Sequence, residues 1–242
     1  MRLPALATMV FVLACWTAAG AWAGALVVVS DSAAIGYARG MVLEDGTSVK
    51  VPAGERLALI DESGRGVMLR GPYDGPVKSP SAGAPQPAAV LPAIKAILDP
   101  AVSLSIGAAR NVGDGPQPPD PKLVDVSGDA TVCVEPGTTV RLWRATPTRH
   151  ATLFVTRLST GEHADLDWPA NEATVAWPAS IHLVDGESYQ FALAGAMTKP
   201  RLLVKFVSPG DPSIASARRL SDAGCRNQAL TMLEAIAAAD GH

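Results

Sequence analysis

The sequence has few of the side chains on which catalysis usually depends. Its 242 residues include only four histidines, and histidine is the commonest general acid or base near neutral pH. We find no Gly-x-Ser-x-Gly, His-Glu-x-x-His, phosphate-binding glycine loop or paired-cysteine metal motif. The sequence therefore favours a protein that is not an enzyme, and we expect no cofactor.

Positive charge is also scarce. The chain has 20 Lys and Arg against 23 Asp and Glu, a formal net charge of −3. A chain with this balance lacks the excess of basic residues that attracts a phosphate backbone or an anionic bilayer. The composition therefore argues against nucleic acid as a partner.

Cysteine is limited to three residues, Cys15, Cys133 and Cys225. Cys15 lies in an N-terminal segment that we expect to be removed or lipidated, which leaves an even pair. In an oxidising compartment a disulfide between Cys133 and Cys225 is the default. Two separate buried thiols are the alternative, and a metal site is disfavoured because no histidine lies at ligand spacing.

Long apolar runs are absent except near the start, where residues 1–23 have the layout of a secretory signal peptide. Arg2 precedes an interrupted apolar stretch that is short for a membrane-spanning helix, which needs about 20 residues. Ala21 and Ala23 offer small residues for cleavage, so we expect a periplasmic protein that begins at Gly24. The alternatives are a lipoprotein acylated at Cys15, which would then contact the membrane, and an uncleaved anchor.

Short apolar segments separated by turn residues follow, and they predict a small β-meander or barrel. Asp45-Gly46 and Ser63-Gly64 supply the turns, since glycine adopts a positive φ at little cost. The expected strands are 26–30, 41–43, 49–51, 57–60 and 67–70.

Proline-rich stretches divide the chain. Residues 71–87 are expected to leave the sheet as a surface loop, and 88–98 predict a short amphipathic helix that packs back onto it. These segments complete a first domain at 24–106. Glycine and proline are concentrated at 107–121, which we interpret as a linker.

Residues 122–207 predict a β-sandwich, and 208–242 predict a C-terminal helical hairpin with Asp211 as the first N-cap. A bond from Cys133 to Cys225 would attach that hairpin to a strand of the sandwich. The predicted fold class is therefore mainly β, with a small meander or barrel, a sandwich and a helical hairpin. The expected sandwich strands are 130–134, 139–143, 151–157, 173–177, 181–184, 188–193 and 202–207.

Residues 162–167 contain the densest group of potential ligands. Alternate residues of a strand share a face, so His163, Asp165 and Asp167 would project together and could hold a divalent ion. With Glu162 they also carry an alternative function, that of an envelope hydrolase or metal-dependent enzyme. The competing interpretation is a strand whose polar face is simply solvated.

Three aromatic residues are candidate binding residues. Trp168 and Trp177 each precede a proline at the end of a predicted strand, and Tyr73 lies in a segment rich in Gly and Pro. Aromatic faces stack on sugars and peptides, which favours a binding role. A tryptophan in a β-sandwich more often belongs to the core, and the Gly and Pro neighbours of Tyr73 favour a ring that packs beneath its own turn.

The first segment resembles the β-repeat of FecR-like periplasmic domains. The resemblance covers residues 25–73 and includes the turns at Pro52-Ala53-Gly54 and Ser63-Gly64. It implies an all-β periplasmic module used in protein–protein signalling or envelope sensing. The second half, from Lys122 on, resembles exported proteins of Gram-negative bacteria to which no role is attached.

We therefore expect an exported module that binds or scaffolds another envelope protein or a glycan, without catalysis. A third interpretation is a structural subunit of a larger envelope assembly, docked through residues 71–87.

Overall fold

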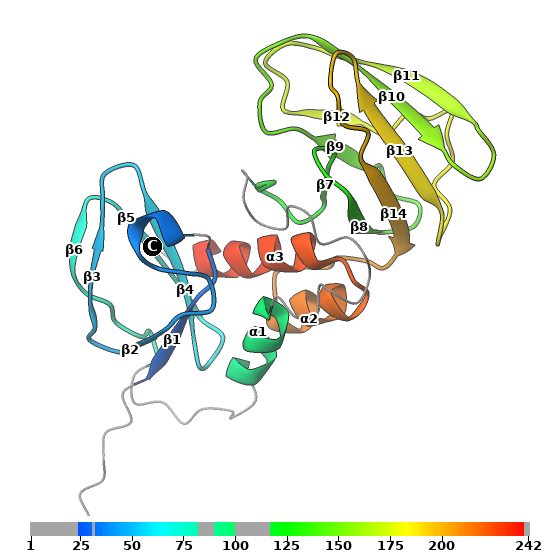
Figure 1. Cartoon of the computed structure of the whole chain (residues 1–242). Helices are drawn as coiled ribbons and strands as arrows, with labels where there is room; N and C mark the ends of the chain where they lie inside the picture. The colour runs from blue at the N-terminus through cyan, green and yellow to red at the C-terminus, as the bar shows by residue number, and fades with distance from the viewer. Residues whose placement is uncertain (1–23, 31, 82–89, 100–116, 240–242) are drawn as a thin grey trace, which may run out of the picture.

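The computed structural model describes residues 24–30, 32–81, 90–99 and 117–239 (Figure 1). The predicted signal peptide at 1–23, Cys15 and most of the expected linker at 107–121 lie outside these residues. Within them the fold is mainly β with a C-terminal helical pair, as predicted. No helix in these ranges combines the length and the apolar character that crossing a bilayer requires.

The N-terminal unit contains two small antiparallel sheets, built from six strands, and one 3₁₀ turn between the first two strands. The larger sheet has the strand order β2-β1-β4-β5, and β3 pairs with β6 in the smaller one. Among the described residues no barrel closes, so the structure has open sheets. The elements are β1 (Ala25–Val28), η1 (Ala33–Ile35), β2 (Val42–Glu44), β3 (Ser48–Val51), β4 (Arg56–Asp61), β5 (Gly66–Arg70) and β6 (Tyr73–Pro76).

Strand β6 differs from the sequence interpretation, in which the sheet ended before residue 71. Val51 pairs with Tyr73 and Ser48 with Pro76, and the Val77 N–H continues the pairing to Thr47 at 2.8 Å. Proline is tolerated here because it lies at the end of an edge strand, where its missing N–H breaks no interior ladder.

Strands β1 and β4 are buried on both faces. Leu26 and Leu59 pack toward the β3–β6 sheet, whereas Val27 and Ile60 pack toward the helices. Burial on both sides explains why these strands are continuous apolar runs rather than alternating ones. The larger sheet is therefore the middle layer of the N-terminal unit.

Three helices fill the space between the two β units in Figure 1: α1 (Val90–Leu98), α2 (Ile214–Asp222) and α3 (Arg226–Ala239). Helix α3 contacts β4 and β5 at one end and β8 at the other. Arg39 of the N-terminal unit forms a 3.3 Å ion pair with Glu234 on α3. Arg226 donates to the carbonyl of Leu98 at 2.9 Å, where α1 ends. The C-terminal helices thus pack on both β units.

The second β unit consists of two facing sheets. The strand orders are β11-β10-β13-β14-β8 and β12-β9-β7, and their apolar inner faces form one buried core. The strands are β7 (Leu123–Asp125), β8 (Ala130–Val134), β9 (Arg141–Trp143), β10 (Ala151–Arg157), β11 (His163–Trp168), β12 (Thr174–Ala176), β13 (Ser188–Leu193) and β14 (Arg201–Phe206).

Residues 181–184, predicted as a strand, are irregular in the structure. Their backbone groups bond to a side chain rather than to a neighbouring strand. The Tyr189 hydroxyl donates to the His182 carbonyl at 2.8 Å and accepts from the Val184 N–H at 3.0 Å. A local apolar run does not reveal such a competitor for its backbone hydrogen bonds.

The predicted disulfide is confirmed. Cys133 of β8 bonds to Cys225 in the turn between α2 and α3, with the two Cα atoms 5.8 Å apart. Both residues are buried. The N-cap of α2 is Ser213 rather than the expected Asp211, and its side chain accepts from the Ser216 N–H at 3.1 Å.

Candidate functional site

The five-stranded sheet has an outward surface that the helices cover only at one end. At that end Cys133 is bonded to Cys225, and the Lys205 ammonium donates to the Ala223 carbonyl at 2.7 Å. Further along, the outward side chains of β10, β11 and β13 are mostly exposed or half-buried. Phe154 in the middle of β10 is 40% exposed, although it is a large apolar residue. This surface is the candidate site.

Strand register arranges the surface as three rows that run across the strands. Residues paired side by side belong to one row, and strand alternation turns all of them outward. We call the residues of the three rows together the outer face. The rows are His163, Thr156, Gln190 and Arg201; then Asp165, Phe154, Ala192 and Lys199; then Asp167, Thr152 and Ala194.

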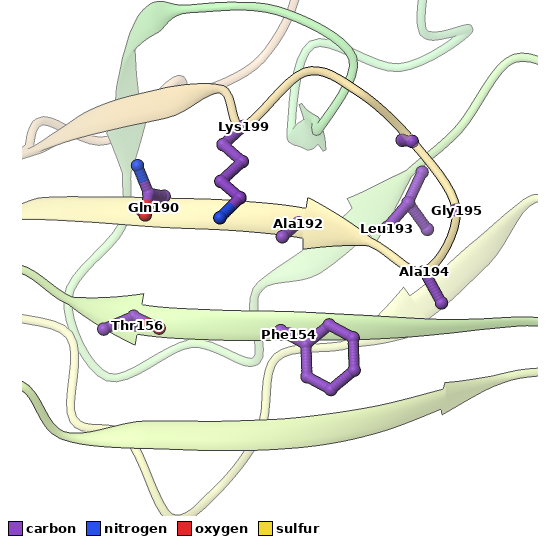
Figure 2. Close-up of a pocket in the computed structure, with 9 residues that line it drawn as sticks. Phe154, Thr156, Gln190, Ala192, Leu193, Ala194, Gly195 and Lys199 are labelled. Atoms are coloured by element: carbon purple, nitrogen blue, oxygen red, sulfur yellow. The ribbon is translucent and has the colours of Figure 1, made fainter.

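Lys199 enters the second row through the loop before β14. The Phe191 N–H donates to the Pro200 carbonyl at 2.8 Å, which holds that loop against β13. Figure 2 shows the Lys199 side chain extended across β13 toward Gln190 and Ala192, with the Phe154 ring on neighbouring β10.

A shallow groove of about 380 Å³ lies in the middle of the outer face. The Phe154 ring borders the groove on β10, and small lining residues such as Ala192 and Gly195 leave space for it between the larger side chains. Thr156, Gln190 and Lys199 contribute a hydroxyl, an amide and an ammonium group. The groove therefore combines an aromatic surface with hydrogen-bonding groups and one cation.

The charges of the outer face are separated. Asp165 and Asp167, both exposed, lie on β11 at one edge of the sheet, whereas exposed Lys199 and Arg201 lie beside β13 on the other side. Asp167 also contacts His150, with 2.5 Å between its carboxylate and Nε2. The strands between these two columns carry no charge in the three rows, so the face is acidic on one side and basic on the other.

The residues of the predicted metal site are on one face but do not form one ligand set. His163, Asp165 and Asp167 are all exposed on β11, as strand alternation predicted. A strand rises about 3.3 Å per residue, so the first and last of them are roughly 13 Å apart. Among the described residues, no group of three His, Cys, Asp or Glu side chains is close enough to hold a metal ion. Glu162 instead lies 4.0 Å from the Arg157 guanidinium.

The structure directs both candidate tryptophans toward the sandwich core. Trp168 is fully buried, with its indole N–H donating to the Glu172 carbonyl at 2.8 Å and the Arg144 guanidinium 4.8 Å from its ring centre. Trp177 is half-buried and packs edge-to-face on Tyr189, with 5.1 Å between ring centres. Neither lies on the outer face.

Tyr73 belongs to the N-terminal unit, where its half-buried ring packs against the smaller core. Its hydroxyl donates to the Pro76 carbonyl at 2.7 Å, within β6. The ring therefore closes over its own strand, and β6 lies in the other β unit from β10, β11 and β13 (Figure 1).

Sequence reasoning missed Phe154 and Lys199. A signal for Phe154 was present, because alternation in 151–157 aligns it with Thr152 and Thr156 on the polar side of the strand. A large apolar side chain between two threonines on the polar side of a strand is unusual and indicates a binding surface. Lys199 had no comparable signal, since only the pairing of β13 with the following segment brings it to the groove.

Comparisons of this chain with protein-family models, with curated proteins and with solved structures found no match.

Proposed function

We propose that this chain is an exported binding or scaffolding module of the periplasm, which contacts an envelope protein or a glycan through the outer face and carries out no catalysis. The groove beside Phe154 is the observation that carries this proposal. An aromatic ring next to hydroxyl, amide and ammonium groups suits a sugar ring or a peptide, because one surface supplies both stacking and hydrogen bonds. Strands β10 and β13 position Phe154, Thr156 and Gln190 more rigidly than loops would, and Lys199 joins them from the loop before β14.

The periplasmic location is supported by residues far apart in the chain. The disulfide between Cys133 and Cys225 is the kind of bond that persists in oxidising compartments. The signal-like segment at 1–23 and the FecR-like pattern at 25–73 favour the same location. The proposed role of the N-terminal unit is then that of a protein-contact module.

The proposal is tested with the natively exported chain. We expect its first residue to be Gly24, and we expect crosslinking in intact cells or co-sedimentation with isolated cell wall to identify one reproducible partner. Phe154→Ser is expected to weaken that contact strongly, because it removes the aromatic surface of the groove. Phe206→Ala is the matched control. The exposed fraction of Phe206, 37%, is similar to that of Phe154, but strand alternation turns Phe206 to the opposite side of the sheet.

Two results would overturn the proposal. The first is a partner that Phe154→Ser and Phe206→Ala retain equally, which would place the contact elsewhere. The second is a reproducible hydrolytic activity of the purified chain that is abolished by His163→Ala, which would favour an enzyme.

A further inference from the structure

We propose that the outer face binds the outer face of a second copy of this chain, forming a two-fold symmetric dimer. This inference rests on the proposed function, because it names the protein that the same face contacts. It is motivated by the middle row, in which Phe154 has the small Ala192, and Asp165 has Lys199, on the other side of the sheet centre.

The shape of the face is self-complementary. A two-fold axis parallel to the strands, between β10 and β13, places β10 of one copy over β13 of the other and keeps every row in place. Phe154 then lies over Ala192 of the second copy, because the two residues are paired side by side within one copy. Ala192 lines the groove, so the ring of each copy enters the groove of the other.

The charges follow the same symmetry. The axis that exchanges β10 and β13 also places β11 over β14 and the loop before it, so Asp165 faces Lys199 of the second copy. Symmetry makes this pair twice. A two-fold axis perpendicular to the strands through the middle row would instead place Asp165 over Asp165 and Lys199 over Lys199 of the second copy, which is unfavourable at short range. In the first row His163 faces Arg201 of the second copy, and in the third row Asp167 has no outer-face residue opposite it.

The size of the face sets the expected strength. The sheet from β11 to β14 is about 14 Å wide, and three rows cover roughly the same length. This area is below the roughly 800 Å² per partner of standard stable complexes. We therefore expect a weak dimer, with a dissociation constant on the order of micromolar or higher, that is lost on dilution.

Charge exchange tests the dimer by sedimentation equilibrium of the disulfide-intact chain. Asp165→Lys places two lysines opposite one another at each pair, and Lys199→Asp places two acids there, so each variant alone is expected to dimerise about tenfold more weakly or worse. An equimolar mixture restores both pairs and is expected to recover wild-type association as a heterodimer. Lys122→Glu, at an exposed residue before β7, is the control for a change of net charge alone.

Phe154→Ser is expected to abolish association at concentrations where Phe206→Ala leaves it unchanged. Thermal melts of all variants establish that each is folded, and these exposed substitutions are expected to leave the melting temperature nearly constant. The inference is overturned if the wild-type chain remains monomeric at millimolar concentration, or if the mixture of charge variants associates no better than each variant alone.

The same variants separate this inference from the proposed function. A monomeric wild-type chain whose envelope partner is lost on Phe154→Ser would reject the dimer and retain the binding module. A wild-type dimer that dissociates on Phe154→Ser, with recovery in the charge-variant mixture, would support the dimer whether or not a further partner is found.

Discussion

The side-chain amide of Gln228 bonds to both backbone groups of Cys133. Its Oε1 accepts from the Cys133 N–H at 2.6 Å, and its Nε2 donates to the Cys133 carbonyl at 2.8 Å and to the Pro121 carbonyl at 2.8 Å. Because β8 is an edge strand, these groups face away from β14, and Gln228 takes the place of a neighbouring strand. The contact and the disulfide at the same residue together attach α3 to the sandwich.

Gln228→Leu is therefore expected to destabilise the chain. Leucine has a similar volume but leaves the buried backbone groups of Cys133 without partners, at a cost of about 1–3 kcal/mol each. Denaturant unfolding measures the change. Gln190→Leu, at a half-buried residue of the outer face, is the control and is expected to change stability by less than about 0.5 kcal/mol. Equal effects of the two substitutions would contradict the role given to Gln228.

Breaking the disulfide is also expected to lower stability. The bond joins residues 92 positions apart. Chain-entropy arguments give roughly 4–5 kcal/mol for a loop of this length, through restriction of the unfolded chain. Unfolding is compared for the oxidised protein, the reduced protein and the double variant Cys133→Ala/Cys225→Ala. Identical melting curves for all three would show that the bond contributes nothing.

Gly66→Ala is expected to disturb the packing of α3 on the N-terminal sheet. A Cβ atom at Gly66 would lie 2.3 Å from the Ala237 Cα and 2.4 Å from the Ile236 carbonyl oxygen, so the helix backbone has to move. Overpacking of this kind costs about 1–3 kcal/mol or more. Gly128→Ala is the matched control, since a Cβ there has no neighbour within 4 Å, and it is expected to be neutral. Equal losses in both variants would contradict this account.

Asp61 is expected to make stability fall in acid. Burial raises the pKa of this carboxyl, but hydrogen bonds from Ser63, the Arg65 N–H, Ser81 and Ser79 outweigh it, so the pKa lies below the ordinary value of 3.8. The unfolded chain therefore binds the proton first as the pH decreases. The stabilisation is complete above about pH 4 and is lost as the pH falls through the folded pKa.

Asp61→Asn provides the test. We expect it to lower the free energy of unfolding at pH 7 by about 1–3 kcal/mol, because charged hydrogen bonds are replaced by neutral ones. Its stability should also decrease less than that of the wild type between pH 5 and pH 2, as measured by urea unfolding at each pH. Asp74→Asn, at an exposed carboxylate of β6, is the control and should reproduce the acid dependence of the wild type. A parallel decrease in Asp61→Asn would assign the acid sensitivity to other groups.

Much of the β structure was predictable because it depends on local patterns. The expected strands at 130–134, 151–157 and 188–193 have the observed bounds, since apolar residues alternate or cluster there between turn residues. β6 was missed because its proline and glycine residues resemble a loop, and only the neighbouring β3 gives it a partner. The irregular segment at 181–184 was wrongly predicted as a strand for the converse reason. Its backbone groups form hydrogen bonds with the Tyr189 hydroxyl and not with a neighbouring strand.

The candidate site was predictable only in part. Alternation correctly aligned His163, Asp165 and Asp167 on one face, but the rise of a strand places the first and last of them roughly 13 Å apart, and the predicted metal site did not take that distance into account. Trp168 and Trp177 were ambiguous because a strand pattern does not state which of its two faces is covered. The groove combines β10 with the loop before β14, and these segments meet only through sheet pairing with β13.

The sequence by itself determined the local properties: the mainly β class, most strands, the helical pair and an even pair of cysteines that could bond. These follow from side-chain periodicity and turn residues, which act over a few positions. Only the tertiary structure decided which part of the outward surface of the five-stranded sheet the helices leave uncovered. That outcome depends on Cys133 of β8, which holds α3 at one end of the sheet through its disulfide to Cys225 and its hydrogen bonds with Gln228. Cys133 and Gln228 are 95 residues apart in the chain, and their contact leaves Phe154 at the surface.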